Sequence, residues 1–98
     1  MIVDDNVFER NAFKGMFDQY QFECDLALRG LEALEMVQVR FSSGQQMYQL
    51  IMIDYKMPET DGCELAIMIL NFLKEMQSPE AKLPYIVCIT SFMNRTIK

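Results

Sequence analysis

The sequence predicts an α/β protein in which a doubly wound parallel sheet carries helices on both faces. Two observations lead to this fold class. The hydrophobic period changes repeatedly between that of a strand and that of a helix, in the order β-α-β-α-β-α-β. Two of the strand candidates are apolar without interruption, which is typical of parallel strands covered on both faces. The 98 residues suffice for one such domain.

The first half of the chain supplies two strand candidates and two helices. Ile2–Val3 is an apolar stub, and Asn6 with Glu9 has the spacing of a helix N-cap pair. The helix that follows carries an apolar stripe formed by Phe13, Met16, Phe17 and Tyr20. Phe22–Leu28 alternates apolar and polar residues, which predicts a strand at an edge of the sheet. After Gly30, helical spacing returns at Leu34, Val37 and Phe41.

The second half supplies the two apolar strands and a third helix. Leu50–Ile53 and Tyr85–Ile89 are apolar throughout, so both are expected at the centre of the sheet. Asp61 and Glu64 have the spacing of a capping box. The helix that starts there has an apolar side formed by Leu65, Ile69, Phe72, Leu73 and Met76. If the first strand lies between the second and third, the strand order is 2-1-3-4 and ligands bind beyond the carboxyl ends of the strands.

Composition excludes several classes of function. The net charge of −5 argues against a nucleic-acid surface, and no apolar stretch is long enough to span a membrane. We therefore expect this domain to bind neither nucleic acid nor a membrane. The absence of histidine removes Ser-His-Asp triads and any role as a phosphohistidine carrier. Cys24, Cys63 and Cys88 lie in apolar runs without C-x-x-C spacing. We expect reduced core cysteines and a cytoplasmic location.

Acidic and hydroxyl side chains follow the strands at the edge where ligands are expected. Asp4 and Asp5 follow the first strand, Asp54 follows the third and Thr90 follows the fourth. Two like charges ~4 Å apart repel by about 4 kcal/mol at an effective dielectric near 20, so these carboxylates need a cation, a proton or a lysine. Oxygen ligands without His or Cys favour Mg²⁺ or Mn²⁺, and a carboxylate beside such a cation can accept a phosphoryl group. Each residue alone could simply cap a helix or end a strand, but convergence from three strand ends favours a site.

Three segments resemble the receiver domain of two-component response regulators. They are the acidic pair within residues 2–6, the D-x-x-M-P-x-x-D-G pattern from Asp54 to Gly62, and the Thr–Ser pair that follows Tyr85–Ile89. Residues 27–34 are similar to the start of that family's second helix. The resemblance extends from residue 1 to about residue 93 and implies the flavodoxin-like (receiver) topology.

The resemblance also implies a role for each residue of the cluster. Asp54 is then the phosphoacceptor, which takes a phosphoryl group from a histidine kinase or a histidine phosphotransfer protein. Asp5 binds Mg²⁺ (or Mn²⁺) directly, Asp4 contributes through water, and the backbone carbonyl of Lys56 completes the protein ligands. Thr90 is the switch hydroxyl. The expected activity is at most Mg²⁺-dependent self-phosphorylation and self-dephosphorylation, and the output is a population shift of a binding surface.

The chain departs from the family pattern near its ends. The family has a lysine at the end of a fifth strand, and Lys98 follows Thr90 too closely to be that residue. We therefore expect residues 1–98 to be one receiver domain, incomplete at the C-terminus without the fifth strand and helix and slightly trimmed at the N-terminus. Tyr85–Ile89 is then an exposed edge strand, through which self-association is expected.

Other functions fit the sequence less well. A receiver-like scaffold that no longer accepts phosphate is favoured by the missing lysine and opposed by the intact Asp5, Asp54 and Thr90, and it is kept as the alternative. An aspartate-nucleophile phosphatase needs a second Asp two residues after the nucleophile, where this chain has Lys56. Flavin binding needs small and hydroxyl residues in the turn after the first strand, and that turn lacks them.

Overall fold

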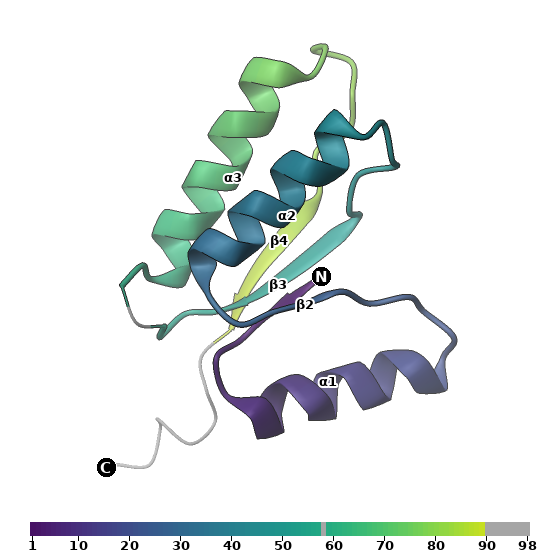
Figure 1. Ribbon diagram of the computed structural model, residues 1–98, viewed down its shortest axis with the longest axis vertical. Helices are drawn as coiled ribbons and strands as arrows, with labels where there is room; N and C mark the ends of the chain where they lie inside the picture. Colours follow the sequence, from purple (N-terminus) through teal and green to yellow (C-terminus); the bar gives the residue numbers. More distant parts are fainter. Residues whose placement is uncertain (58, 90–98) are drawn as a thin grey trace.

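A four-stranded parallel sheet in the order β2-β1-β3-β4 forms the centre of the computed structural model, which describes residues 1–57 and 59–89 (Figure 1). The strands are β1 (Ile2–Val3), β2 (Leu26–Ala27), β3 (Leu50–Asp54) and β4 (Tyr85–Ile89). The helices are α1 (Val7–Gln19), α2 (Gly30–Ser42) and α3 (Gly62–Met76). The predicted fold class and strand order are both confirmed.

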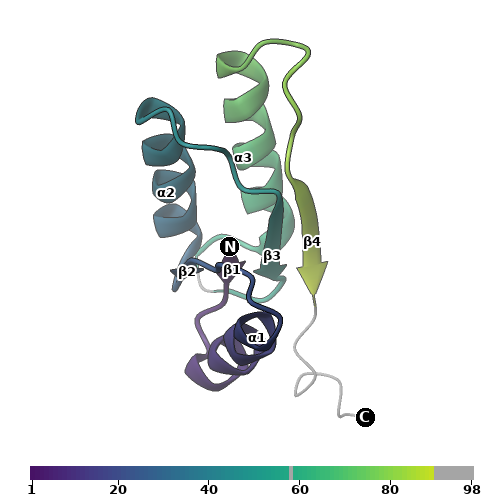
Figure 2. The ribbon, with the colours of Figure 1, turned by 90° about the vertical axis from the view of Figure 1, so that its right-hand side faces the viewer.

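The sheet separates α1 from the other two helices. α2 and α3 pack side by side over one face, and α1 lies on the opposite side of the strands (Figure 1). Figure 2 shows that β3 and β4 end on the same side of the molecule, close to α1. The functional residues predicted at the strand ends are therefore expected between the sheet and the start of α1.

The core lies between the sheet and the α2–α3 layer. Its fully buried members include Val3, Ala27, Ala33, Val37, Ile51, Ile53, Leu65, Ile69 and Leu73. Three of the residues predicted for the apolar side of the third helix are among them. α1 instead contributes no fully buried side chain, so the predicted stripe of that helix is only partly covered.

Both predicted helix caps are present. The Asn6 side chain accepts hydrogen bonds from the backbone N–H groups of Phe8 (2.9 Å) and Glu9 (3.1 Å). Asp61 accepts from the Glu64 N–H (2.8 Å), while the Glu64 side chain accepts from the Asp61 N–H (3.3 Å), which completes a capping box. These caps fix the starts of α1 and α3, the helices that follow β1 and β3.

The strand predicted over Phe22–Leu28 is wrong in extent, although its edge position is confirmed. Within the part of the chain that the structure describes, its only strand neighbour is β1, whose two residues pair with Leu26 and Ala27. Residues before that register therefore have no strand to pair with, and Phe22 packs edge-to-face on Phe17 with ring centroids 6.3 Å apart.

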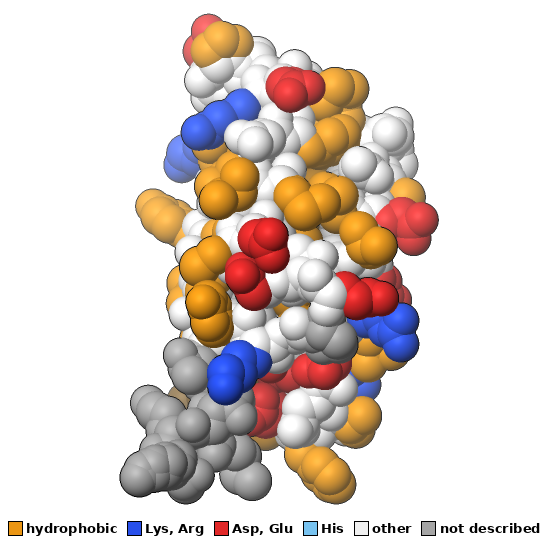
Figure 3. Space-filling view, turned by 90° about the vertical axis from the view of Figure 1, so that its left-hand side faces the viewer, with side chains coloured by type: hydrophobic (Ala, Val, Ile, Leu, Met, Phe, Trp, Pro, Cys, Tyr) orange, Lys and Arg blue, Asp and Glu red, His pale blue; other side chains and the backbone are white. Residues whose placement is uncertain are grey.

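The two apolar strands differ in their surroundings. β3 is central, as predicted. β4 lies at the edge of the described sheet, which is the exposed edge position predicted for Tyr85–Ile89 and not the central position predicted from its apolar run alone, and Tyr85 is 80% exposed. Apolar side chains are also visible among the acidic ones on the surface shown in Figure 3. No helix among the described residues is long and apolar enough to cross a membrane.

The cysteines are free, as predicted, but their expected place in the core is wrong for two of them. Cys24 is half-buried, whereas Cys63 and Cys88 are exposed. Cys88 lies on the edge strand β4, and Cys63 is the second residue of α3, next to the buried Gly62. An apolar run thus places a residue in a helix or strand, but it does not determine which side of that element is covered.

Candidate functional site

The ends of β1 and β3 bring three carboxylates together. Asp54 is the last residue of β3, and Asp4 and Asp5 directly follow β1, which pairs with β3. One carboxylate oxygen from each of the three residues lies within 4.8 Å of the other two. Asp4 and Asp54 are buried, and Asp5 is exposed. The convergence predicted for these three residues is therefore present.

Backbone hydrogen bonds hold the two buried carboxylates in place. Asp4 Oδ1 accepts from the Asn6 N–H (2.9 Å), and Asp54 Oδ1 accepts from the Lys56 N–H (3.3 Å). The Arg10 guanidinium donates to the Asp4 backbone carbonyl (3.1 Å). Lys56 is thus joined to Asp54 through its backbone N–H, and the metal-ligand role expected for its carbonyl stays a prediction.

One oxygen of the cluster lacks a donor. Asp4 Oδ2 is buried, and no N–H or O–H of the described residues reaches it. A buried polar atom without a partner costs ~1–3 kcal/mol, and more when it is charged. Its neighbours are other carboxylates, so the oxygen needs a proton or a cation rather than another acceptor.

The electrostatics of the cluster point the same way. Burial raises the pKa of Asp4 to about 7, the Asn6 N–H opposes this shift, and the negative charges of Asp54 and Glu9 add to it. Burial also raises the pKa of Asp54, against the effect of the Lys56 N–H. Without a cation, the cluster therefore retains protons at pH values where an exposed aspartate has lost them.

The donor set suits a hard divalent cation. Asp4, Asp5 and Asp54 offer only oxygen, and oxygen ligands are those that Mg²⁺ and Mn²⁺ prefer. A cation there would supply a partner for the unpaired Asp4 oxygen and would offset the repulsion among the carboxylates. The residues present therefore fit such an ion.

One predicted site residue, the expected switch hydroxyl Thr90, lies outside the described residues. Glu9, which the sequence predicts only as a helix-cap partner, also acts on the site through its charge. Its charge acts on both Asp4 and Asp54. A signal was available, since the first turn of a helix that follows a strand lies beside the carboxyl end of that strand.

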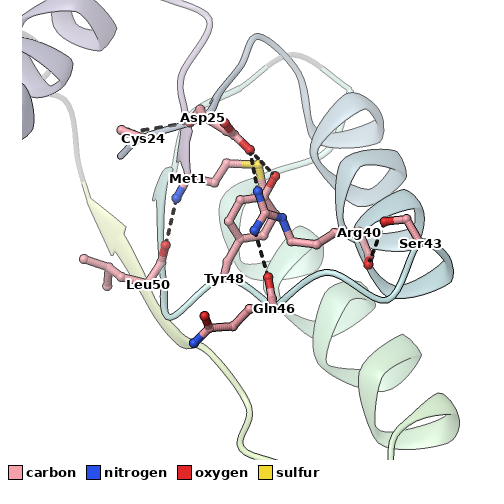
Figure 4. Close-up of polar contacts among 8 residues, drawn as sticks. All are labelled: Met1, Cys24, Asp25, Arg40, Ser43, Gln46, Tyr48 and Leu50. Carbon is pink, nitrogen blue, oxygen red and sulfur yellow. Dashed lines mark hydrogen bonds and ion pairs between the residues drawn. The ribbon is translucent and has the colours of Figure 1, made fainter. Parts of the chain in front are cut away.

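A second polar cluster lies at the opposite end of the sheet, beside the amino ends of β2 and β3 (Figure 4). The Tyr48 hydroxyl donates to Asp25 (2.6 Å), and the Arg40 guanidinium pairs with the same carboxylate (3.1 Å). Arg40 also lies over the Tyr48 ring, 4.1 Å from its centroid, and donates to the Gln46 carbonyl (2.8 Å). Burial and the bond to Asp25 raise the pKa of Tyr48 to about 12.

This second cluster joins three segments of the fold. A hollow of about 980 Å³ is lined by these side chains, but by none of the three clustered aspartates. Asp25 precedes β2, Arg40 belongs to the last turn of α2, and Tyr48 precedes β3. Their contacts connect the three segments, which gives them a structural role.

Comparison with known proteins points to one family. A family model described as the response regulator receiver domain matches residues 1–95. A probable histidine kinase 1 from Oryza sativa subsp. indica is 32% identical over 72 residues, which are 74% of this chain and 7% of that protein. The chain thus spans only a small part of this curated relative.

Solved structures show the same fold. The receiver domain of the histidine kinase CKI1 from Arabidopsis thaliana, complexed with Mg²⁺ and BeF₃⁻, has a TM-score of 0.76 and 27% identity, covering 91% of this chain and 62% of that one. A second structure contains the receiver domain of the response regulator Ssk1 in complex with the histidine phosphotransfer protein Ypd1, both from Saccharomyces cerevisiae. It has a TM-score of 0.66 and 23% identity, covering 91% of this chain and 59% of that one.

Proposed function

Because this chain belongs to the response regulator receiver domain family, we propose that Asp54 accepts a phosphoryl group from a phosphohistidine on a partner protein. Membership of the family places the domain in two-component signalling. The proposed partner is a histidine kinase or a histidine phosphotransfer protein, and the proposed cofactor is Mg²⁺ (or Mn²⁺). The cytoplasm is the proposed location, supported by three free cysteines.

The observation that carries the proposal is the cluster of Asp4, Asp5 and Asp54 at the ends of β1 and β3. Their carboxylate oxygens lie within 4.8 Å of one another, and one buried oxygen of Asp4 has no donor among the described residues. A group of this kind needs positive charge, and it presents a carboxylate beside the place where that charge would bind.

In the proposed transfer, an Asp54 carboxylate oxygen attacks the phosphorus of the phosphohistidine. A P–O bond forms, the P–N bond breaks, and the imidazole leaves with the bonding electrons and takes up a proton from solvent. Asp4, Asp5, Asp54 and the Lys56 backbone carbonyl would hold Mg²⁺, which supplies charge neutralisation for the phosphoryl oxygens when bound. The Lys56 N–H orients Asp54 through its 3.3 Å hydrogen bond. Thr90 is the proposed switch hydroxyl.

The related proteins support both the cofactor and the partner. The Arabidopsis receiver domain was crystallised with Mg²⁺ and BeF₃⁻, and the yeast one with a histidine phosphotransfer protein. The rice relative is named a probable histidine kinase. The output that follows phosphorylation is proposed to be a population shift of a binding surface, because the added phosphoryl group brings about −1.5 to −2 charges into the cluster.

The test is the intact mass of the chain after incubation with acetyl phosphate, with and without Mg²⁺. We expect one added phosphoryl group that requires both Mg²⁺ and Asp54. Asp54→Asn should therefore gain none, while Asp18→Asn, an exposed change at the far end of α1, should behave like the unmodified chain. If a chain shown to be folded by circular dichroism gains no mass, the alternative of a non-phosphorylating scaffold is supported instead.

A further inference from the structure

Two of the three cysteines belong to elements that meet on one face of the sheet, Cys63 in α3 and Cys88 in β4. Cys88 is the register partner of Ile53 in β3, and paired residues of neighbouring parallel strands point to the same face. Ile53 faces the start of α3, because a Cβ on Gly62 would lie 3.2 Å from Ile53 Cγ2. Cys88 therefore points toward the same end of α3, where Cys63 directly follows Gly62.

The Cys63 and Cys88 thiols are accessible and interact with each other. α3 begins at the end of the molecule where β4 ends (Figure 2), and both cysteine side chains are exposed, so a dissolved reagent can reach them. Partial burial raises the pKa of the Cys88 thiol, and the neighbouring Cys63 thiol raises it further. Cys24, the third cysteine, lies at the opposite end of the sheet, where its thiol donates to the Asp25 carbonyl (3.6 Å). It is too distant to take part in the pair.

We propose that Cys63 and Cys88 form a modification site, where a small disulfide oxidant converts the two thiols into one reversible disulfide between α3 and β4. A disulfide joins Cα atoms about 4.4–6.8 Å apart. Neighbouring strands lie about 4.8 Å apart, so Cys88 is displaced by one strand from the residue that Gly62 contacts, and Cys63 is displaced from Gly62 by one residue. β4 has a neighbouring strand on only one side within the described sheet, which leaves its backbone room to adjust. The inference does not depend on phosphorylation of the acidic cluster.

The reaction is a pair of thiol–disulfide exchanges with oxidised glutathione as the oxidant. The Cys63 sulfur first attacks one sulfur of oxidised glutathione, so that a mixed disulfide forms and one glutathione leaves as the thiolate. The Cys88 sulfur then attacks Cys63, which forms the protein disulfide and releases the second glutathione. The protein thiols lose two electrons and two protons, and the two glutathione molecules take them up. Cys63 attacks first, because the raised pKa of Cys88 keeps that thiol protonated.

The test counts free thiols after the chain is incubated with oxidised glutathione, alkylated with N-ethylmaleimide and weighed as the intact protein. We expect the folded chain to lose two of its three alkylatable thiols, and dithiothreitol should restore them. Cys24→Ser is the matched control and should lose both of its remaining thiols. Cys63→Ser should form no internal disulfide. Cys88→Ser should stop at the mixed disulfide with glutathione, because the thiol that resolves it is missing.

A second measurement asks whether the fold itself favours the disulfide. The bond closes a loop that contains most of α3, so it restricts the unfolded chain more than the folded one. We expect the equilibrium constant for oxidation to be about 10-fold larger in the folded chain than in concentrated urea, and the Tm of the oxidised chain to rise by about 5–10 °C.

Three results would overturn the inference. The first is a chain, shown to be folded by circular dichroism, that keeps all three thiols in oxidised glutathione. The second is a linked peptide that contains Cys24, or disulfides that form only between two chains on a non-reducing gel. The third is an equal equilibrium constant for oxidation in buffer and in urea, which would show that the fold does not hold Cys63 beside Cys88.

Discussion

Gly62 is the position where a single methyl group should disturb both the fold and the site. It is the buried first residue of α3, and its N–H donates to the Tyr55 carbonyl (3.0 Å). A Cβ there would lie 3.0 Å from the Asp54 carbonyl oxygen, 3.0 Å from Tyr55 Cα and 3.2 Å from Ile53 Cγ2. Two of these three atoms are backbone atoms, which cannot rotate away as a side chain would.

The magnitude follows from two opposing effects. Overpacking of this kind costs ~1–3 kcal/mol. Replacing glycine by alanine also reduces the conformational entropy of the unfolded chain, which raises the free energy of unfolding by about 0.4–1 kcal/mol. Gly62→Ala should therefore lower the free energy of unfolding by about 1–2 kcal/mol, or the Tm by about 4–15 °C for a domain of this size. Gly15→Ala is the matched control, because Gly15 lies within α1 and a Cβ there meets nothing within 4 Å.

Urea unfolding of the three proteins, followed by circular dichroism, measures both effects. Gly15→Ala should raise the free energy of unfolding by about 0.5–1 kcal/mol, since alanine is the better helix former. Opposite signs for the two glycine substitutions would agree with the close contacts at Gly62. If Gly62→Ala were as stable as the unmodified chain, the argument that the segment around Asp54 cannot yield would be refuted. Calorimetry should also show weaker Mg²⁺ binding by Gly62→Ala.

Three further predictions concern the charges, the second polar cluster and the edge strand. Burial raises the pKa of Asp4 from 3.8 to about 7, so between these values the folded chain binds a proton that the unfolded chain has lost. The free energy of unfolding of the metal-free chain should thus fall as pH rises through this window, while its affinity for Mg²⁺ should increase. Equal urea midpoints of the metal-free chain at about pH 4.5 and about pH 7.5 would contradict the predicted loss of stability. Tyr48→Phe removes the 2.6 Å hydrogen bond to Asp25 and should lower the free energy of unfolding by about 1–2 kcal/mol, and an unchanged value would show that the cluster does not support the fold. Sedimentation velocity should show that the 98-residue chain self-associates through Tyr85–Ile89 in a concentration-dependent way. Val87→Lys should reduce this association, because a charge on an exposed edge opposes strand pairing, and a monomer at all concentrations would argue against association through this edge.

Local patterns in the sequence predicted the features that depend on neighbouring residues. The changes of hydrophobic period predicted every helix and strand in the described part of the chain, and the caps at Asn6 and Asp61 needed only residues within one turn. The convergence of Asp4, Asp5 and Asp54 was also accessible, because parallel strands end at one edge of a sheet.

The features that the sequence did not predict depend on what lies across from a residue. Apolar and polar residues alternate over Phe22–Leu28 as in a strand. β1 has only two residues for this segment to pair with, so only Leu26–Ala27 forms a strand. Cys88 lies in an apolar run, but β4 has a neighbouring strand on only one side within the described sheet. Asp25, Arg40 and Tyr48 are separated along the chain, and no spacing rule brings them together.

α1 carries no fully buried side chain, yet its first turn is bonded to the acidic cluster through Asp4 and Arg10. Helices with little buried apolar surface open first in local unfolding, so amide hydrogens of α1 should exchange with deuterium faster than those of α3, which buries Leu65, Ile69 and Leu73. Any ion that orders Asp4 would also slow the opening of this helix. The exchange rate of α1 amides would therefore report whether the site is occupied, at a distance from the carboxylates themselves.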